Sequence, residues 1–214
     1  VTETYPPEVN GVAVTVARLI EGLLLRGHEI DLVRPRQALR GPQGTAVEGL
    51  QELLMRGMPI PRYPQLRMGL PAKAALISQW QRRRPDLVHV ATEGPLGWSA
   101  LHAAIHLRLP VTSDFRTNFH TYTGPYGRGW LQRPITAYLR KFHNRTHWTT
   151  VPTEALRIEL EALNFQRLVV LPRGVDTHAF SPAYRSHALR ASWGVDRDDL
   201  VVAVVGRLAP EKNL

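Results

Sequence analysis

Residues 85–114 read PDLVHVATEGPLGWSALHAAIHLRLPVTSD and decide the fold. Two short runs rich in β-branched residues, Leu87 to Val90 and Val111 to Ser113, are typical of buried strands. The segment between them, Pro95 to Leu107, is rich in Ala, Leu and Ile and begins with a proline, which suits a first helical turn. A strand, a helix and a second strand in this order predict a parallel βαβ unit.

The same alternation continues in both directions along the chain. Towards the N-terminus, residues 12–24 have apolar side chains on one helical face, and a strand is expected at residues 30–33. Towards the C-terminus, we expect helices at residues 130–145 and 154–163 and strands at residues 148–151, 168–171 and 201–205. The sequence therefore predicts an α/β fold with a doubly wound, mainly parallel sheet. In such a sheet, ligands bind at the carboxyl ends of the strands.

The chain is expected to contain one domain and the start of another. Residues 1–172 should form an N-terminal Rossmann-like domain, residues 173–182 a junction, and residues 183–214 the beginning of a second, incomplete Rossmann-like domain. Both ends are expected to be cut, because the first residues run straight into a loop and the last follow a strand without its helix. The stretch from Gly41 to Pro71 holds many glycines and prolines, so an irregular excursion is expected there.

Composition excludes several classes of protein. The 214 residues include no cysteine, which excludes a disulfide framework, thiolate metal sites and cysteine nucleophiles and favours a cytoplasmic location. No apolar run approaches the roughly 20 residues that span a bilayer. The net charge of +9 favours an anionic partner, and two acid-free stretches, residues 53–85 and 115–153, carry much of the surplus. A solvated basic face is the alternative, and nucleic acid is disfavoured because no recognition motif accompanies the charge.

Two loops have residues that suit a bound diphosphate. Gly11 stands at the start of the first helix, where a residue without a side chain lets a ligand approach backbone N–H groups. After the strand expected at residues 201–205 come Gly206, Arg207 and Lys212, and two cations at the end of a strand suit a diphosphate. Taken singly, a turn glycine and two surface cations remain the alternative.

Five segments, in this order, resemble family 4 of the retaining glycosyltransferases, which have the two-domain GT-B fold. The segments are Pro6-x-x-x-Asn10-Gly11-Val12, Arg26-Gly27-His28-Glu29-Ile30, Pro85-Asp86-Leu87-Val88-His89, Gly174-Val175-Asp176-x-x-x-Phe180-x-Pro182 and Gly206-Arg207-Leu208-x-x-Glu211-Lys212. The nearest resemblance is to lipid-acting members: phosphatidylinositol mannosyltransferases, related α-mannosyltransferases and sulfoquinovosyl-diacylglycerol synthases. The resemblance implies that the first domain binds the acceptor and the second binds the nucleotide sugar.

The resemblance also implies the reaction. A hexose, expected to be of the mannose type, would pass from a GDP- or UDP-linked sugar to a lipid, a glycan or another hydroxyl acceptor. The family's Glu-x7-Glu segment would lie beyond the end of this chain. The alternative is therefore a fragment that binds acceptor or membrane without catalysing transfer.

Residue roles follow from the same resemblance. Arg207 and Lys212 match the pair that binds the donor diphosphate, and His120 matches the histidine beside the transferred sugar. Gly11 and Gly206 match glycines near the diphosphate. Breaking a sugar–phosphate bond builds negative charge on the leaving group, so fixed cations lower the barrier without a metal or a cofactor.

The loops after the strands are also expected to line an acceptor cleft. The candidate residues are Asn10, Glu93, Arg116, Tyr122 and Tyr126. Glu93 lies between a strand and a helix, so capping the helix that follows is its alternative role.

The helix expected at residues 130–145 is amphipathic. Its apolar side chains lie on one helical face, and Arg133, Arg140, Lys141 and Arg145 lie on the others or at its end. Each lysine or arginine near anionic lipid contributes about 1 kcal/mol of attraction. We therefore expect a cytoplasmic protein that binds reversibly to the anionic inner face of the plasma membrane. The alternative is that the apolar face packs on the sheet and leaves ordinary solvated cations.

Overall fold

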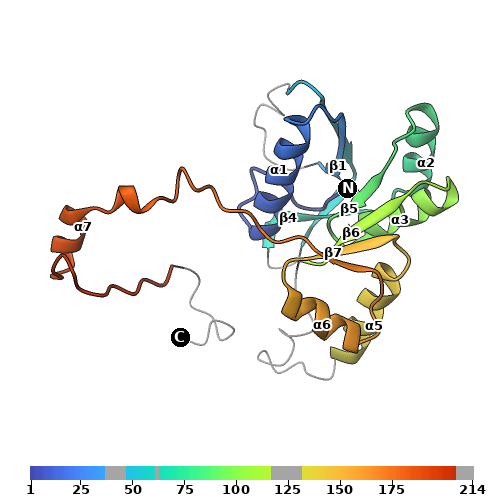
Figure 1. Cartoon of the computed structure of the whole chain (residues 1–214). Helices are drawn as coiled ribbons and strands as arrows, with labels where there is room; N and C mark the ends of the chain where they lie inside the picture. Colours follow the sequence, from blue (N-terminus) through green and yellow to red (C-terminus); the bar gives the residue numbers. More distant parts are fainter. Residues whose placement is uncertain (37–46, 61–62, 117–131, 206–214) are drawn as a thin grey trace.

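The computed structural model describes residues 1–36, 47–60, 63–116 and 132–205. Its centre is a parallel sheet with helices on both faces (Figure 1). β1 (Ile30–Pro35) pairs in parallel with β2 (Leu50–Met55). A four-stranded parallel sheet contains, in order, β5 (Val88–Val90), β6 (Val111–Asp114), β7 (Trp148–Val151) and β8 (Leu168–Val170).

Residues 1–2 join these two sheets. The Thr2 N–H donates to the carbonyl of Val33 in β1 (2.9 Å), and the Ala91 N–H just after β5 donates to the carbonyl of Val1 (2.9 Å). The order is therefore β2, β1, residues 1–2, β5, β6, β7 and β8. The chain winds outward from its first residues in one direction and then in the other, so the predicted doubly wound α/β fold is confirmed.

Four expected helices lie close to their expected bounds: α1 (Gly11–Leu24), α3 (Pro95–His106), α5 (Gln132–His143) and α6 (Glu154–Ala162). α1 packs Val16 and Ile20 against Leu32. α5 and α6 pack together against β7 and β8. α2 (Lys73–Arg82) is not among the expected helices, and it buries Leu76 and Trp80 in the same core as α3.

The expectation of an irregular stretch from residue 41 to residue 71 is wrong. Its described part contains β2 and an antiparallel hairpin of β3 (Gly57–Ile60) and β4 (Tyr63–Gly69). Two of its glycines mark close packing instead of loops. A Cβ on Gly57 would lie 2.8 Å from the Cβ of Pro35, and a Cβ on Gly69 would lie 2.5 Å from the Cβ of Leu96. β4 therefore lies directly against the start of α3.

Residues 173–205 form no buried core of their own. They contain a 3₁₀ turn (Pro182–Tyr184) and α7 (His187–Ser192), and they extend away from the sheet (Figure 1). Large apolar side chains here, such as Phe180 and Trp193, are exposed. The strand expected at residues 201–205 is not formed, because no strand in the described ranges lies beside it to complete its hydrogen bonds. The division into domains stays a prediction.

Candidate functional site

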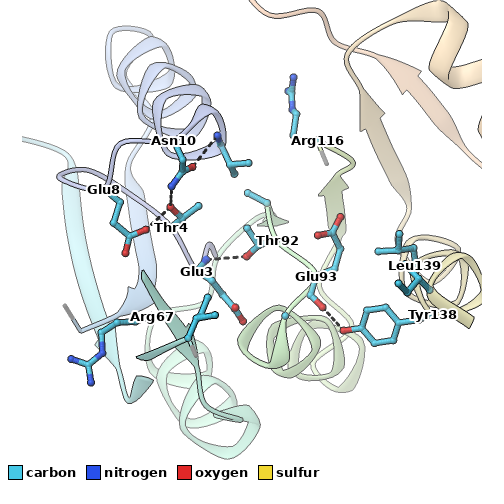
Figure 2. Close-up of a pocket in the computed structure, with 15 residues that line it drawn as sticks. Glu3, Thr4, Glu8, Asn10, Arg67, Thr92, Glu93, Arg116, Tyr138 and Leu139 are labelled. Atoms are coloured by element: carbon cyan, nitrogen blue, oxygen red, sulfur yellow. Dashed lines mark hydrogen bonds between the residues drawn. The ribbon is translucent and has the colours of Figure 1, made fainter. Parts of the chain in front are cut away.

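A cavity of about 500 Å³ opens at the carboxyl ends of the central strands. It lies where the winding of the sheet changes direction, between residues 1–2 and β5, which is where ligands bind in doubly wound sheets. The loop before α1, the β3–β4 hairpin, the ends of β5 and β6, and α5 line it (Figure 2). Its polar lining consists of Glu3, Thr4, Glu8, Asn10, Arg67, Thr92, Glu93, Arg116 and Tyr138.

The loop before α1 is held in place by its own side chains. Oδ1 of Asn10 accepts the N–H groups of Val12 (3.1 Å) and Ala13 (2.9 Å), which caps α1. Nδ2 of Asn10 donates to Oγ1 of Thr4, which donates in turn to Glu8. Asn10 therefore lines the cavity, and most of its hydrogen-bonding capacity is spent on shaping the loop; its role towards an acceptor stays a prediction.

Gly11 begins α1 between two lining residues. Beyond its own helix and chain neighbours, an added Cβ would meet one described atom within 4 Å, Nη1 of Arg173 at 3.6 Å. The segment that carries Arg173 also contacts α1 through an ion pair of 3.8 Å between Arg18 and Asp176. A guanidinium thus lies beside the helix start that the sequence assigns to a diphosphate.

The side-chain carboxyl group of Glu3 lies at the start of α3. Its Oε1 accepts the N–H of Leu96, in the first turn of the helix, at 3.0 Å. It lies against Gly94, where a Cβ would come within 2.2 Å of Oε1. Burial raises the pKa of Glu3 to about 7; the Leu96 N–H opposes this shift, and the charge of Glu93 adds to it. Near neutral pH Glu3 therefore exists in both protonation states.

Glu93 is held by two residues of α5. Nε2 of His143 lies 3.1 Å from Oε1 of Glu93, and the Tyr138 hydroxyl donates to the backbone carbonyl of Glu93 (Figure 2). The alternative role of Glu93 as a helix cap is wrong. The N-cap of α3 is Gly94, and Glu3 occupies the N–H of the first turn instead. Glu93 lines the cavity, and its role towards an acceptor stays a prediction.

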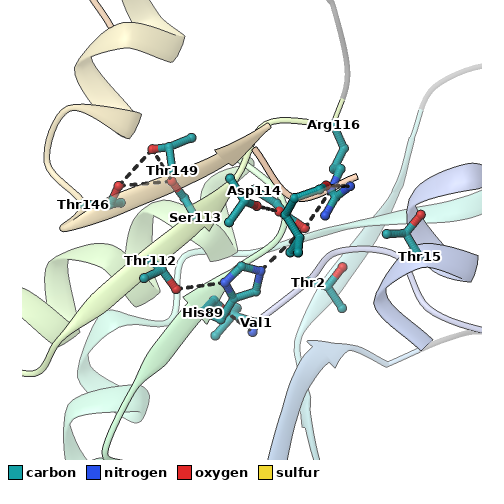
Figure 3. Close-up of polar contacts among 12 residues, drawn as sticks. Val1, Thr2, Thr15, His89, Thr112, Ser113, Asp114, Arg116, Thr146 and Thr149 are labelled. Carbon is teal, nitrogen blue, oxygen red and sulfur yellow. Dashed lines mark hydrogen bonds and ion pairs between the residues drawn. The ribbon is translucent and has the colours of Figure 1, made fainter. Parts of the chain in front are cut away.

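Arg116 also lines the cavity, but its charge is already matched. Its Nε lies 3.1 Å from Oδ2 of Asp114, and its Nη1 donates to the carbonyl of Leu171 at 3.3 Å (Figure 3). Burial would raise the pKa of Asp114, but interactions with His89, followed by those with Thr150 and Arg116, lower it to about 2. Arg116 therefore joins the ends of β6 and β8 at the cavity wall.

Of the predicted site residues, the structure brings together Asn10, Glu93 and Arg116, with Gly11 at the edge. The remaining six lie outside the described residues: His120, Tyr122, Tyr126, Gly206, Arg207 and Lys212. The sequence alone does not single out Glu3, Tyr138 or His143 as site residues. Glu3 could have been identified from the sequence, because it follows the first residues of the sheet and so lies at the same edge as Glu93. His143 could not, because its partner Glu93 is 50 positions away.

The apolar face of α5 is largely used for packing. Leu139 and Phe142 are buried in the core, whereas Arg133, Lys141 and Arg145 are exposed. The packing interpretation therefore holds for these two apolar side chains, and contact of the exposed cations with a membrane stays a prediction. Within the described ranges, no helix combines the length and the apolar character needed to cross a bilayer.

Relatives of the chain include several glycosyltransferases. The chain is 33% identical over 215 residues to a GDP-mannose-dependent alpha-mannosyltransferase of Mycolicibacterium smegmatis, covering 100% of this chain and 57% of that protein. It is 30% identical over 171 residues to the sulfoquinovosyl transferase SQD2 of Arabidopsis thaliana, covering 78% and 33%. It is 27% identical over 229 residues to an alpha-monoglucosyldiacylglycerol synthase of Acholeplasma laidlawii, covering 100% and 56%. The chain thus spans a third to somewhat over half of the length of these relatives.

A solved structure and a family model complete the comparison. Sucrose-phosphate synthase from Thermosynechococcus elongatus matches with a TM-score of 0.61 at 12% identity, over 92% of this chain and 49% of that chain. At this identity the match shows the fold alone, and it confirms the α/β class of GT-B type. The model of Glycosyltransferase Family 4 matches residues 9–179. That range contains most of the cavity and far more than half of the sequence, so the chain belongs to Glycosyltransferase Family 4.

Proposed function

We propose that the whole protein is a retaining glycosyltransferase that moves mannose from GDP-mannose to a hydroxyl group of a lipid or glycan acceptor. The observation that carries this proposal is the carboxylate-lined cavity at the winding switch of the sheet, in a chain of this family. Three relatives that match the whole chain are named GDP-mannose-dependent alpha-mannosyltransferases, which favours this donor. Two others are named alpha-monoglucosyldiacylglycerol synthases, which favours a lipid acceptor.

The cavity suits the hydroxyl-rich head group of such an acceptor. Carboxylates accept hydrogen bonds from hydroxyls, and Glu3, Glu8 and Glu93 all line the cavity. Glu3 can also donate when it is protonated, because its pKa is about 7. Apolar Ile60 and Ile135 line the same cavity and suit the non-polar parts of an acceptor.

The donor would bind across from this cavity. Gly11 would let the diphosphate approach the start of α1, and Arg207 and Lys212 would hold its charge while the sugar–phosphate bond breaks. His120 would lie beside the sugar, as the family resemblance implies.

The enzyme would bind its acceptor at a membrane surface. Arg133 and Lys141 are exposed on α5, the helix that also lines the cavity, so they would bring the cavity near anionic lipid. We propose reversible binding at the inner face of the plasma membrane.

Transfer by the full-length enzyme tests the function. With GDP-mannose and a lipid extract as acceptor, we expect a mannolipid whose anomeric configuration, followed by NMR, matches that of the donor. Arg207→Ala and Lys212→Ala should each lower kcat by roughly 10²-fold or more, because each removes charge stabilisation from the leaving group. Near-normal kcat in both variants, or an inverted product, would contradict the proposal.

A non-catalytic binding module is the second candidate. It would be favoured if the full-length protein transfers no sugar and residues 1–214 bind acceptor lipid but not GDP-mannose in calorimetric titrations. Tight binding of GDP-mannose by residues 1–214 would argue against it.

A further inference from the structure

His143 stands behind the wall of the cavity. Its side chain has 0% exposure, whereas the side chain of its partner Glu93 has 10% and lines the cavity. The two ring nitrogens have different neighbours: Nε2 lies 3.1 Å from Oε1 of Glu93, and Nδ1 lies 2.9 Å from Oγ of Ser113. The imidazole therefore connects the cavity to hydroxyl groups in the core.

The hydroxyls behind His143 favour one placement of its proton. Oγ1 of Thr146 lies 2.8 Å from the backbone carbonyl of His143, which only accepts, so Thr146 can donate there. Oγ of Ser113 lies 3.0 Å from Oγ1 of Thr149, which can donate to it (Figure 3). Ser113 can then donate to Nδ1, which lies 2.9 Å away. A neutral ring that accepts at Nδ1 carries its proton on Nε2, where it points at Glu93.

The geometry of this pair is fixed from several sides. The rings of Phe115 and Phe142 have centroids 5.1 and 5.2 Å from that of His143, so the imidazole has packed neighbours. The Tyr138 hydroxyl donates to the backbone carbonyl of Glu93. α5 thus holds Glu93 at its backbone and at Oε1. Within the described ranges no group donates to the second carboxylate oxygen, Oε2, which leaves this atom for a ligand in the cavity.

We propose that Glu93 binds an acceptor hydroxyl through Oε2 and that His143 is the positioning residue that holds the carboxylate ready for it. This inference rests on the glycosyl transfer proposed above. Hydrogen bonds to an ionised carboxylate are about twice as strong as neutral ones, so one such bond contributes to acceptor affinity. A carboxylate already fixed by His143 loses little freedom on binding. The rival explanation is that the pair only joins α5 to the loop after β5.

Steady-state kinetics of the full-length enzyme separate these explanations. Glu93→Gln keeps the shape of the side chain and removes its charge, and His143→Phe keeps an aromatic ring and removes the N–H. Each should raise the KM for the acceptor roughly tenfold, as expected for one lost bond to a charged group, and leave the KM for the donor unchanged. His143→Gln retains an N–H donor and should restore most of the acceptor affinity.

A matched control removes a partly buried ion pair elsewhere. Nη2 of Arg34 lies 2.7 Å from Oε2 of Glu52, between β1 and β2, and neither residue lines the cavity. Glu52→Gln should lower stability without changing the acceptor KM. The inference is overturned if His143→Phe behaves like Glu52→Gln, or if both cavity variants raise the donor KM as much as the acceptor KM.

The protonated nitrogen of His143 can be measured without any transfer. In the ¹⁵N-labelled full-length protein, long-range ¹H–¹⁵N correlation should show the Nε2–H form of His143 in the native enzyme. A proton on Nδ1 alone would overturn the positioning role. An enzyme that shows the Nε2–H form and transfers no sugar would instead place the failure with the proposed function.

Discussion

At the residue scale, Glu3 has the most informative protonation equilibrium. Burial raises its pKa from 4.5 to about 7, so between these values the folded protein keeps a proton that the unfolded chain has lost. Its contribution to stability is therefore complete below about pH 4.5 and falls as the pH rises to about 7. Glu3→Gln should abolish this fall and be more stable than the parent at about pH 8 by up to roughly 3 kcal/mol, since one pKa unit is about 1.4 kcal/mol. Urea unfolding from about pH 5 to pH 8 measures it, and parallel curves for both proteins would contradict it.

Gly11 offers a second prediction at this scale. Among the described residues outside its own helix and chain neighbours, only the guanidinium of Arg173 lies near the position of an added Cβ, at an ordinary contact distance of 3.6 Å. Gly11→Ala should therefore leave the melting temperature nearly unchanged. Gly11→Val should raise the KM for the nucleotide sugar, because a branched side chain obstructs the approach of a diphosphate to the helix start. An unchanged donor KM in Gly11→Val would remove this residue from the donor site.

At the element scale, the β3–β4 hairpin depends on the absence of a side chain. A Cβ on Gly69 would lie 2.5 Å from the Cβ of Leu96, which is fully buried. Gly69→Ala should therefore destabilise the protein by about 1–3 kcal/mol, the usual cost of overpacking. Gly22→Ala is the matched control, because a Cβ at this position in the last turn of α1 meets, among the described residues beyond its own helix, only the movable side chain of Arg26 at 3.5 Å. It should stabilise by up to about 1 kcal/mol. Equal effects in thermal unfolding would show that the hairpin packs differently.

Helix α5 carries the membrane prediction. Its exposed cations Arg133 and Lys141 should bind vesicles that contain anionic lipid, and each should contribute about 1 kcal/mol that is lost at high salt. The double alanine variant of the full-length protein should sediment less with such vesicles. Arg18→Ala with Arg26→Ala removes one exposed cation of α1 and one just after its end, and should have little effect. Equal sedimentation with neutral and anionic vesicles would leave α5 with only its packing role.

The same scale shows what the sequence can and cannot predict. α1 and α3 can be predicted from the spacing of their apolar residues and from the residues at their start, because both signals act within one helical turn. The β3–β4 hairpin is not predicted from the sequence, because a glycine such as Gly69 occurs in loops as well as where two segments pack closely. The group that meets the first turn of α3 is not predicted, because it is Glu3, 93 positions from Leu96, whose N–H it accepts. Contacts between distant segments leave no local pattern.

At the scale of the whole molecule, the cavity is assembled from segments that are far apart in the sequence. The first loop, the hairpin, the ends of β5 and β6, and α5 each contribute one wall. Fold class and the edge of the sheet that carries the site follow from the order of strands and helices alone. The carboxylates that give the site its character required the three-dimensional arrangement.

The position of residues 1–2 sets an order for folding. Thr2 pairs with Val33 of β1 across 31 positions (33 minus 2), whereas Val1 meets His89 of β5 only after the chain closes a loop of 88 positions. Closing the longer loop has the larger entropic cost and is the slower step. The contact between Val1 and the region of β5 therefore forms late. The amides at this contact should gain protection from hydrogen exchange after those of β1 and β2. A chain folded only as far as β2 has one wall of the site and no cavity.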